Sequence, residues 1–193
     1  MANWFKDELT NRNFLSPIGF RFVLEKAKKT AFLCQKAEIP NLTLGQVEIP
    51  TRGYAVSPIE GNIKYSDLNI DFIVDEDLRN YMEIHNWIRA LGLPSDTNER
   101  KEWEDVWRQK GTAANSQNIK YSDATLQVLN SNYKPSVLVN FKDTFPISLS
   151  TLDFDVTMGD NEYFTATATF QYTLYEVRDP NSTSRKKSYP RNQ

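Results

Sequence analysis

Hydrophobic and polar residues alternate along several segments of the chain, a pattern typical of β-strands with one buried face. Within 67–74 every second residue is apolar, while Asn69 and Asp71 face the other way. Residues 163–176 repeat this pattern over a longer stretch, with threonines opposite the apolar face. At about 3.3 Å per residue this strand would span roughly 45 Å, so we expect it to bend or to extend beyond a compact sandwich.

Shorter apolar stretches predict further strands, bounded by prolines and polar turns. They lie at 18–25, 31–39, 44–50, 123–129, 136–141 and 145–156. In the last of these, Leu152, Phe154 and Val156 are expected to point inward, which leaves Asp153 and Asp155 on the solvated face. The surplus of strands predicts a mainly β (α+β) fold, either a β-sandwich or barrel-like.

The period changes between 77 and 91, where apolar residues recur at spacings of three and four. This stripe predicts an amphipathic helix that packs over the sheet through one face. Acidic residues at 75–77 suit its N-terminus, and Gly92 and Pro94 are typical of a helix end. The expected packing residues are Leu78, Tyr81, Ile84 and Ile88.

A second helix is predicted at 97–110, where opposite charges lie four residues apart and Trp103, Val106 and Trp107 form a narrow apolar stripe. We interpret 92–118 as a partly helical insertion between strands. Residues 1–177 are then expected to form a single β domain, followed by a basic, flexible tail at 178–193.

Charge is divided unequally between this domain and the tail. The chain has 23 basic and 25 acidic side chains, which gives a formal net charge of -2. That balance argues against a generally basic nucleic-acid-binding protein. The tail is basic, which fits a contact with nucleic acid or with an acidic neighbour and fits a solvated end equally well. Its candidate contact residues are Arg185, Lys186, Lys187 and Arg191.

Residues that perform chemistry are scarce. The single cysteine excludes an intrachain disulfide and a cysteine-cluster metal site, and the glycines form no phosphate-binding loop. His85 lies beside the apolar helix stripe and Cys34 in an apolar strand, so both are interpreted as structural. The acidic residues at 75–77 fit a cation or acid–base site less well than helix N-terminal charge. We therefore expect no catalytic residues, no cofactor, no metal and no membrane span.

Five phenylalanines allow an alternative, a monomeric β-domain that binds nucleic acid through aromatic stacking and the basic tail. Because these residues alternate with polar ones, a place in the core is favoured for them. They are Phe20, Phe22, Phe72, Phe164 and Phe170. A hydrolase that uses His85 is a third interpretation, although no nucleophile motif accompanies it.

Long strands carry unpaired edges that a monomer must hide. One solution is a ring of identical copies, which converts the edges into interfaces and requires no chemistry. A channel wall of acidic residues would repel a phosphate backbone. Candidates for such a wall are Asp71, Asp153 and Asp155.

The second half of the chain resembles the tail-tube proteins of contractile-tailed bacteriophages. The resemblance rests on VLVNFKDTFPISLSTLDFD at 137–155, followed by GDNEYFTATATFQYTLYE at 159–176. In that family a strand enters a Phe/Trp-Pro turn, and an acidic Asn-Glu or Asn-Gln turn precedes a long final strand. In the first half, IDFIVDEDLRNYMEIHNWI at 70–88 resembles the family's strand, acidic turn and helix. The resemblance spans roughly residues 13–177.

By this resemblance the protein would be a structural virion protein, either a tube subunit or the related tube initiator of the baseplate. It would form a homo-hexameric ring whose joined sheets line a channel. Rings would stack, a sheath or baseplate would surround them, and DNA would pass without specific binding. The protein would be made in the host cytoplasm, and the insertion and the tail would contact a neighbouring ring or the sheath.

Overall fold

The computed structural model describes residues 14–49, 57–93, 98–109, 120–155 and 163–180. Within these residues, seven strands form one sheet and two more form a separate hairpin. In chain order the elements are β1 (Phe20–Leu24), α1 (Lys28–Phe32), β2 (Cys34–Ala37), β3 (Leu42–Ile49), β4 (Ser57–Tyr65), β5 (Leu68–Ile73), α2 (Arg79–Gly92), α3 (Asn98–Gln109), β6 (Ser122–Leu129), β7 (Pro135–Leu149), β8 (Thr165–Gln171) and β9 (Leu174–Arg178).

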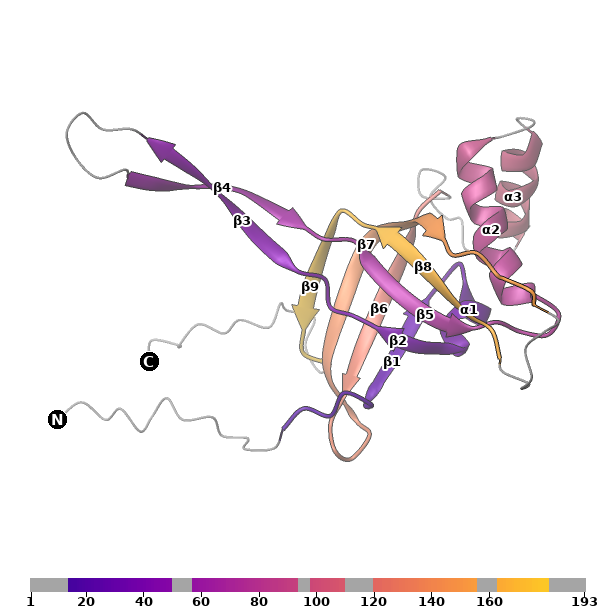
Figure 1. Cartoon of the computed structure of the whole chain (residues 1–193), viewed down its shortest axis with the longest axis horizontal. Helices are drawn as coiled ribbons and strands as arrows, with labels where there is room; N and C mark the ends of the chain where they lie inside the picture. The colour runs from indigo at the N-terminus through magenta and orange to yellow at the C-terminus, as the bar shows by residue number, and fades with distance from the viewer. Residues whose placement is uncertain (1–13, 50–56, 94–97, 110–119, 156–162, 181–193) are drawn as a thin grey trace.

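β7 divides the sheet into two layers. The part of β7 up to Thr144 pairs with β6, and β9 pairs with its other side. The part from Phe145 onward pairs with β8. One layer is therefore β1, β6, β7 and β9, and the other is β2, β5, β8 and the end of β7; Figure 1 shows the second layer in front of the first. Every neighbouring pair of strands is antiparallel, and the described strands do not close into a barrel.

The hydrophobic core lies between the two layers. Leu68, Ile70 and Phe72 of β5 are fully buried, which confirms the face predicted from their alternation. The apolar residues of β8 are buried as well, from Ala166 to Phe170. Burying each large apolar side chain contributes about 1.5–3 kcal/mol, so these alternating strands are held mainly by this contact. The mainly β fold predicted from the sequence is confirmed.

A buried asparagine fixes the start of α2. Asn80 is fully buried, and its Oδ1 accepts a hydrogen bond from the backbone N–H of Asp75 at 3.1 Å. Its Nδ2 donates to the carbonyl of Ile73 at 2.7 Å, so one side chain joins the end of β5 to the helix. Leu78, predicted to lie inside the helix, precedes it with a left-handed backbone (φ 56°). The helix consequently begins at Arg79.

α3 packs on α2 through a pair of tryptophans. The rings of Trp87 and Trp103 are stacked, with centroids 6.1 Å apart and planes inclined by 17°. Arg100 donates hydrogen bonds to the carbonyls of Ala90 and Leu91, which satisfies carbonyl groups at the end of α2. The second helix predicted from the charge pairs is thus confirmed at 98–109. None of the described helices is long and apolar enough to cross a membrane.

Two predicted strands differ from the structure near their ends. The strand expected at 31–39 begins only at Cys34, because Lys28–Phe32 form the short helix α1. The strands expected at 136–141 and 145–156 are one continuous strand that ends at Leu149. The residues that follow it form no strand, and Phe154 is 73% exposed instead of pointing inward. Val156 lies outside the described residues.

The long final strand is broken at residues 172–173 into β8 and β9. The break faces Asp143 of β7, which has a left-handed backbone (φ 54°), so both strands bend at the same place. The hairpin partner β4 was not expected from the sequence. It pairs with β3, and the hairpin projects away from the seven-stranded sheet (Figure 1).

Candidate functional site

The outer face of the β2–β5–β8 layer carries polar side chains that contact one another across strands. In a first row, Asp71 of β5 lies between Lys36 of β2 and Thr167 of β8. The Thr167 hydroxyl donates to Asp71 Oδ1 at 2.7 Å. The Lys36 ammonium lies 3.6 Å from Asp71 Oδ2. A carboxylate at the centre of the layer is therefore paired on both sides.

A second row runs parallel to the first. Asn69 of β5 donates from Nδ2 to Glu38 Oε1 at 2.6 Å. Its Oδ1 accepts the hydroxyl proton of Thr169 at 2.9 Å. Asn69 and Thr169 are also register partners in the ladder between β5 and β8. The two rows follow from the period of two along strands, which places alternate residues on the same face.

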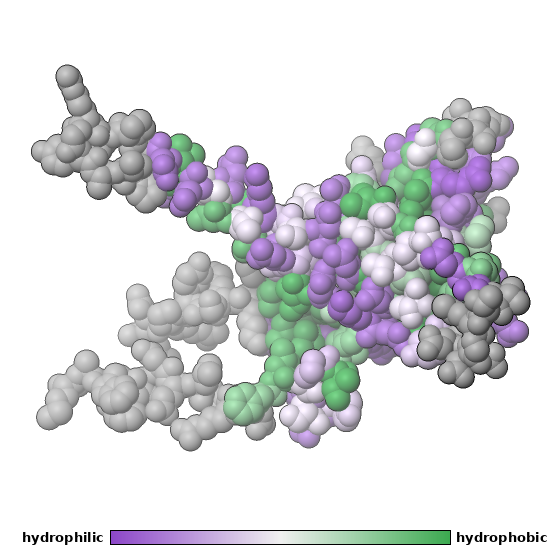
Figure 2. Space-filling view, viewed as in Figure 1, coloured by the Kyte–Doolittle hydropathy of each residue, from purple (hydrophilic) through white to green (hydrophobic). Residues whose placement is uncertain are grey.

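This face is hydrophilic but carries little charge. The two rows contain one cation, Lys36, and two carboxylates, Glu38 and Asp71. Around them lie Thr165 and Gln171, which are exposed and neutral. Figure 2 shows hydrophilic and near-neutral residues over this layer, which is turned towards the viewer. The hydroxyls of Thr167 and Thr169 and one N–H of Asn69 already have acceptors within the rows, so these donors are not available to a passing molecule.

The three acidic residues predicted to line a channel do not lie on one common strand face. Asp71 lies within the first row, with its side chain 25% exposed. Asp153 and Asp155 are exposed in the segment after β7, not on a strand face as expected. The rows were missed by sequence reasoning because alternation predicts which residues share a face but not which residues of different strands are paired. The tail candidates Arg185, Lys186, Lys187 and Arg191 lie outside the described residues.

Three of the four predicted helix residues lie near the core. Ile84 is fully buried, and Tyr81 and Ile88 are partly buried against the core. The Tyr81 hydroxyl donates to the Ser150 carbonyl at 2.9 Å, so α2 also holds the end of β7. Leu78 lies just before α2 and is partly buried. Trp87, the tryptophan of the 70–88 block that carries the family resemblance, is 1% exposed and donates from its indole N–H to the Lys120 carbonyl.

The same layer has an unpaired edge on each side. β2 pairs only with β5 among the described strands. The end of β7, from Phe145 to Leu149, pairs with β8 on one side and has no described strand on the other. It contains Pro146, which is typical of edge strands, and Ile147, which is 41% exposed. The two free edges are four and five residues long.

The alternative aromatic platform does not form on these strands. Phe22, Phe72 and Phe170 are all buried in the core, so their rings are not available to stack on bases. Phe20 is partly buried against the core, and Phe164 is 37% exposed beside Phe154.

Neither a reactive thiol nor a cluster of metal ligands stands out in the described residues. Burial raises the pKa of the Cys34 thiol to about 11, which disfavours the thiolate needed for nucleophilic attack. No group of three histidine, cysteine or acidic residues is placed to hold a metal within that part of the chain.

Residues 9–178 match the sequence profile of a family described as phage tail tube protein. The chain belongs to the phage tail tube protein family. The matched range nearly coincides with the resemblance seen at residues 13–177, which confirms it. No individually curated protein matches the sequence.

Solved structures from contractile assemblies share the fold of this tail tube family member. A chain in the tube-terminating cap of the anti-feeding prophage is 16% identical, covers 93% of this chain and 99% of that one, and has a TM-score of 0.58. A chain in the sheath–tube complex of an extracellular contractile injection system, PVC, is 14% identical, with 87% and 93% covered and a TM-score of 0.53. A chain in the anti-feeding prophage baseplate is 12% identical, with 84% and 93% covered and a TM-score of 0.54.

Proposed function

We propose that this protein is a non-enzymatic structural component of a contractile phage tail, in which six copies form a ring around a channel. The rings stack on one another to build the tube or to start it at the baseplate. The observation that carries this proposal is the β2–β5–β8 layer, which combines a polar outer face with two free edges. Six-fold symmetry is taken from the family resemblance.

The free edges explain how copies join. The layer contains four strands, counting the end of β7, and neighbouring strands are antiparallel. Because four is an even number, β2 of one copy placed beside β7 of the next continues the antiparallel alternation. Such a contact uses two different surfaces, so it is head-to-tail and closes into a ring when the rotation allows it.

The polar face then turns inward and lines the channel. Asp71 lies on its central strand pair, and the exposed Asp153 and Asp155 follow the end of β7 in the chain. DNA passes such a wall without specific binding, because the hydroxyls of Thr167 and Thr169 and one N–H of Asn69 already have acceptors within the rows. The paired Asp71 adds weak repulsion of phosphate.

The remaining elements face outward or towards other rings. Residues 1–177 act as one tail-tube unit, and α2 with the 92–118 insertion forms the surface met by a sheath or baseplate protein. The basic tail at 178–193 contacts an acidic neighbour. The protein is made in the host cytoplasm and resides in the virion tail, without a membrane partner.

Negative-stain microscopy of the concentrated full-length protein tests the proposal. We expect rings of uniform diameter, alone or stacked into tubes. Ile147→Lys introduces a charge at the free edge of β7, where lysine blocks strand addition. The matched control is Val23→Lys, because Val23 is 36% exposed on β1, an edge strand of the other layer.

Ile147→Lys should abolish rings while circular dichroism and thermal unfolding stay close to those of the unchanged protein. Val23→Lys should leave the rings intact. A protein that stays monomeric at high concentration and is absent from imaged tails contradicts the proposal. If Val23→Lys disrupts the rings and Ile147→Lys does not, the other layer joins the copies and the polar face does not line the channel.

A further inference from the structure

The free stretch of β7 has room for one short strand. On one edge of β7, β6 pairs only as far as Thr144, which lies opposite Ser122. Strands β8 and β9 occupy the other edge, so residues 145–149 continue the first edge without a partner among the described strands. β2 is four residues long and pairs with β5 alone. The β2 strand of a neighbouring copy would therefore fit this stretch, in line with β6.

The chain direction decides which end of β2 meets β6. β6 is antiparallel to β7, and a β2 strand added to the same edge must also be antiparallel to continue the alternation of the layer. Ala37, the last residue of β2, then lies at the start of the free stretch, next to the first residue of β6. Residues just before β6 in one copy consequently meet residues just after β2 in the next copy.

The backbone alone joins these two edges weakly. Pro146 lies within the free stretch of β7 and has no N–H to donate. Both strands also carry an irregularity in register, between Cys34 and Lys36 in β2 and between Pro146 and Ser148 in β7. Stretches of four and five residues with a missing donor form few ladder hydrogen bonds. Side chains beside the edges are therefore needed to hold two copies together.

A pocket lies where the chain leaves β2. It has a volume of about 410 Å³, with Glu38, Ile39 and Pro40 on one side and Asp67 and Asn69 on the other. Pockets of this size hold drug-sized ligands, so there is room for two side chains. Ile39 is 51% exposed and supplies an apolar surface. The described residues that line the pocket include two carboxylates and no cation, so the pocket fits a basic and partly apolar occupant.

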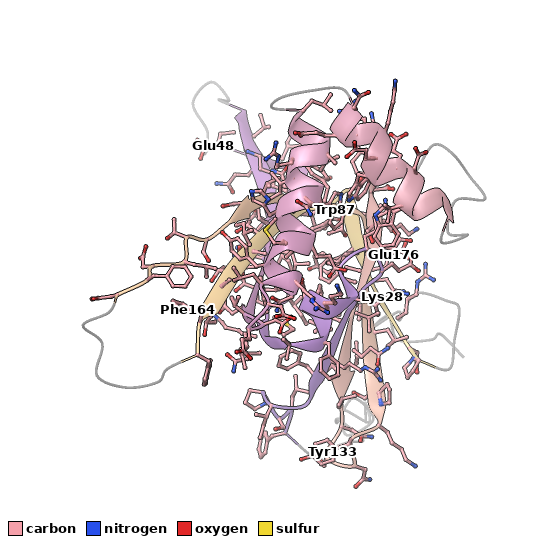
Figure 3. All side chains as sticks on the ribbon, turned by 90° about the vertical axis from the view of Figure 1, so that its right-hand side faces the viewer. Lys28, Glu48, Trp87, Tyr133, Phe164 and Glu176 are labelled. Atoms are coloured by element: carbon pink, nitrogen blue, oxygen red, sulfur yellow. The ribbon has the colours of Figure 1, made fainter. Side chains whose placement is uncertain are left out.

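The two residues before β6 have this chemistry. Lys120 is exposed, and its carbonyl accepts a hydrogen bond from the indole N–H of Trp87 at 3.0 Å. Trp87 belongs to α2, which lies in front of the strands in Figure 3. Tyr121 is 38% exposed, and its ring contacts Phe145 with centroids 5.6 Å apart. These contacts hold the Lys120 backbone and the Tyr121 ring in place within one copy, which lowers the entropy lost on binding.

We propose that Lys120 and Tyr121 of one copy fill the pocket beside β2 of the next copy. The inference rests on the proposed ring and names the side chains that join its copies. The Lys120 ammonium offsets the charge of the two carboxylates, and the Tyr121 ring covers Ile39. Within one chain, β5 and β8 separate β2 from β7, so only a second copy can complete the pocket. The charges orient the contact, and the buried tyrosine provides most of its affinity.

Disulfide trapping in the full-length protein tests this contact. In a Cys34→Ala background, Ile39→Cys and Tyr121→Cys place one thiol on each surface. The matched control combines Ile39→Cys with Tyr133→Cys, because Tyr133 is a tyrosine that is 78% exposed on the turn between β6 and β7. After mild oxidation, a denaturing gel without reductant should show products of up to six linked chains for the first pair and none for the control.

The largest product identifies the contact. Links between neighbours in one ring stop at six chains, whereas products that continue beyond six place the contact between rings and overturn the inference. Rings of the double variant in micrographs without linked products also overturn it, and they leave the proposed function intact. Absence of rings in the unchanged protein refutes the proposed function instead.

Charge reversal provides an independent test, read by analytical ultracentrifugation of a dilution series. Lys120→Glu should raise the protein concentration needed to form rings roughly five-fold, because it brings a further carboxylate to an acidic pocket. Adding Asp67→Lys should restore ring formation. Lys134→Glu, on the exposed turn before β7, is the control and should have no effect. The inference is overturned if Lys120→Glu forms rings at the original concentration or if Asp67→Lys does not rescue it.

Discussion

The tyrosines at the hairpin base allow a quantitative test of how the hairpin is held. The Tyr172 ring contacts Phe141, Tyr175 and Tyr65, with centroid distances of 5.1, 6.1 and 6.0 Å. Its hydroxyl donates to the Ser66 carbonyl at 2.7 Å. Tyr172→Phe removes only the hydrogen bond, and Tyr172→Ala removes the ring as well.

The two variants should lower the free energy of unfolding by amounts that differ several-fold. A hydrogen bond contributes about 1 kcal/mol, and the exposed Ser66 carbonyl can bind water instead, so Tyr172→Phe should cost about 0.5–1 kcal/mol. Truncation of a large aromatic residue in a packed site costs about 3–5 kcal/mol. Because Tyr172 is only partly buried, we expect about 3 kcal/mol for Tyr172→Ala.

Hydrogen exchange measured by mass spectrometry, together with urea unfolding, gives both quantities. In Tyr172→Ala the amides of β3 and β4 should exchange roughly 100-fold faster, since about 3 kcal/mol corresponds to that factor. Tyr163→Ala is the control, because Tyr163 is 66% exposed and its loss should cost less than about 0.5 kcal/mol. The reasoning is refuted if Tyr172→Ala lowers global stability but leaves the hairpin amides as protected as before.

Three further variants test the packing around α2. Trp103→Ala removes the stack on Trp87 and should cost about 2–3 kcal/mol and expose α3 to protease, yet leave rings in micrographs. Burial lowers the pKa of Lys26 to about 8, below the value of 10.5 in the unfolded chain, so the free energy of unfolding should rise between pH 8 and pH 10.5. Lys26→Met should remove that rise and increase the free energy of unfolding at pH 7 by about 1–2 kcal/mol, measured by thermal unfolding. His85→Ala should preserve stability within about 1 kcal/mol and full assembly, because His85 Nδ1 is buried without a partner in the described chain; a loss of assembly would contradict its structural interpretation.

The alternation of apolar and polar residues predicted the core strands well. Burial of one face of a strand requires an apolar residue at every second position, and this requirement can be seen in the sequence of the strand itself. β5 and β8 lie where the sequence places them, and their apolar faces are buried. The helix at 79–92 was likewise predicted from the spacing of three and four residues between its apolar positions. Its start was not, because the left-handed Leu78 and the bonds made by Asn80 depend on the neighbouring β5.

The remaining errors come from interactions between distant segments. Residues 31–33 read as strand from their apolar character, but the Thr30 hydroxyl bonds to the Asn80 carbonyl and favours a helical turn there. The break at 172–173 follows from pairing with a bent β7, which no local pattern reveals. Strand β4 was missed because its apolar residues are exposed, so it lacks the buried face that alternation detects.

The proposed channel wall resists adhesion more through occupied hydrogen-bond donors than through charge. Its two rows carry a single excess negative charge per chain, and charge effects decay within about 8 Å at physiological salt. Most of the acidic residues of the 1–177 domain are not in these rows, for example those at 75–77 before α2. Lys36 is the exception, since its side chain is 71% exposed and keeps unused protons. Its position beside Asp71 offsets its charge, so DNA passage through such a wall should depend only weakly on salt.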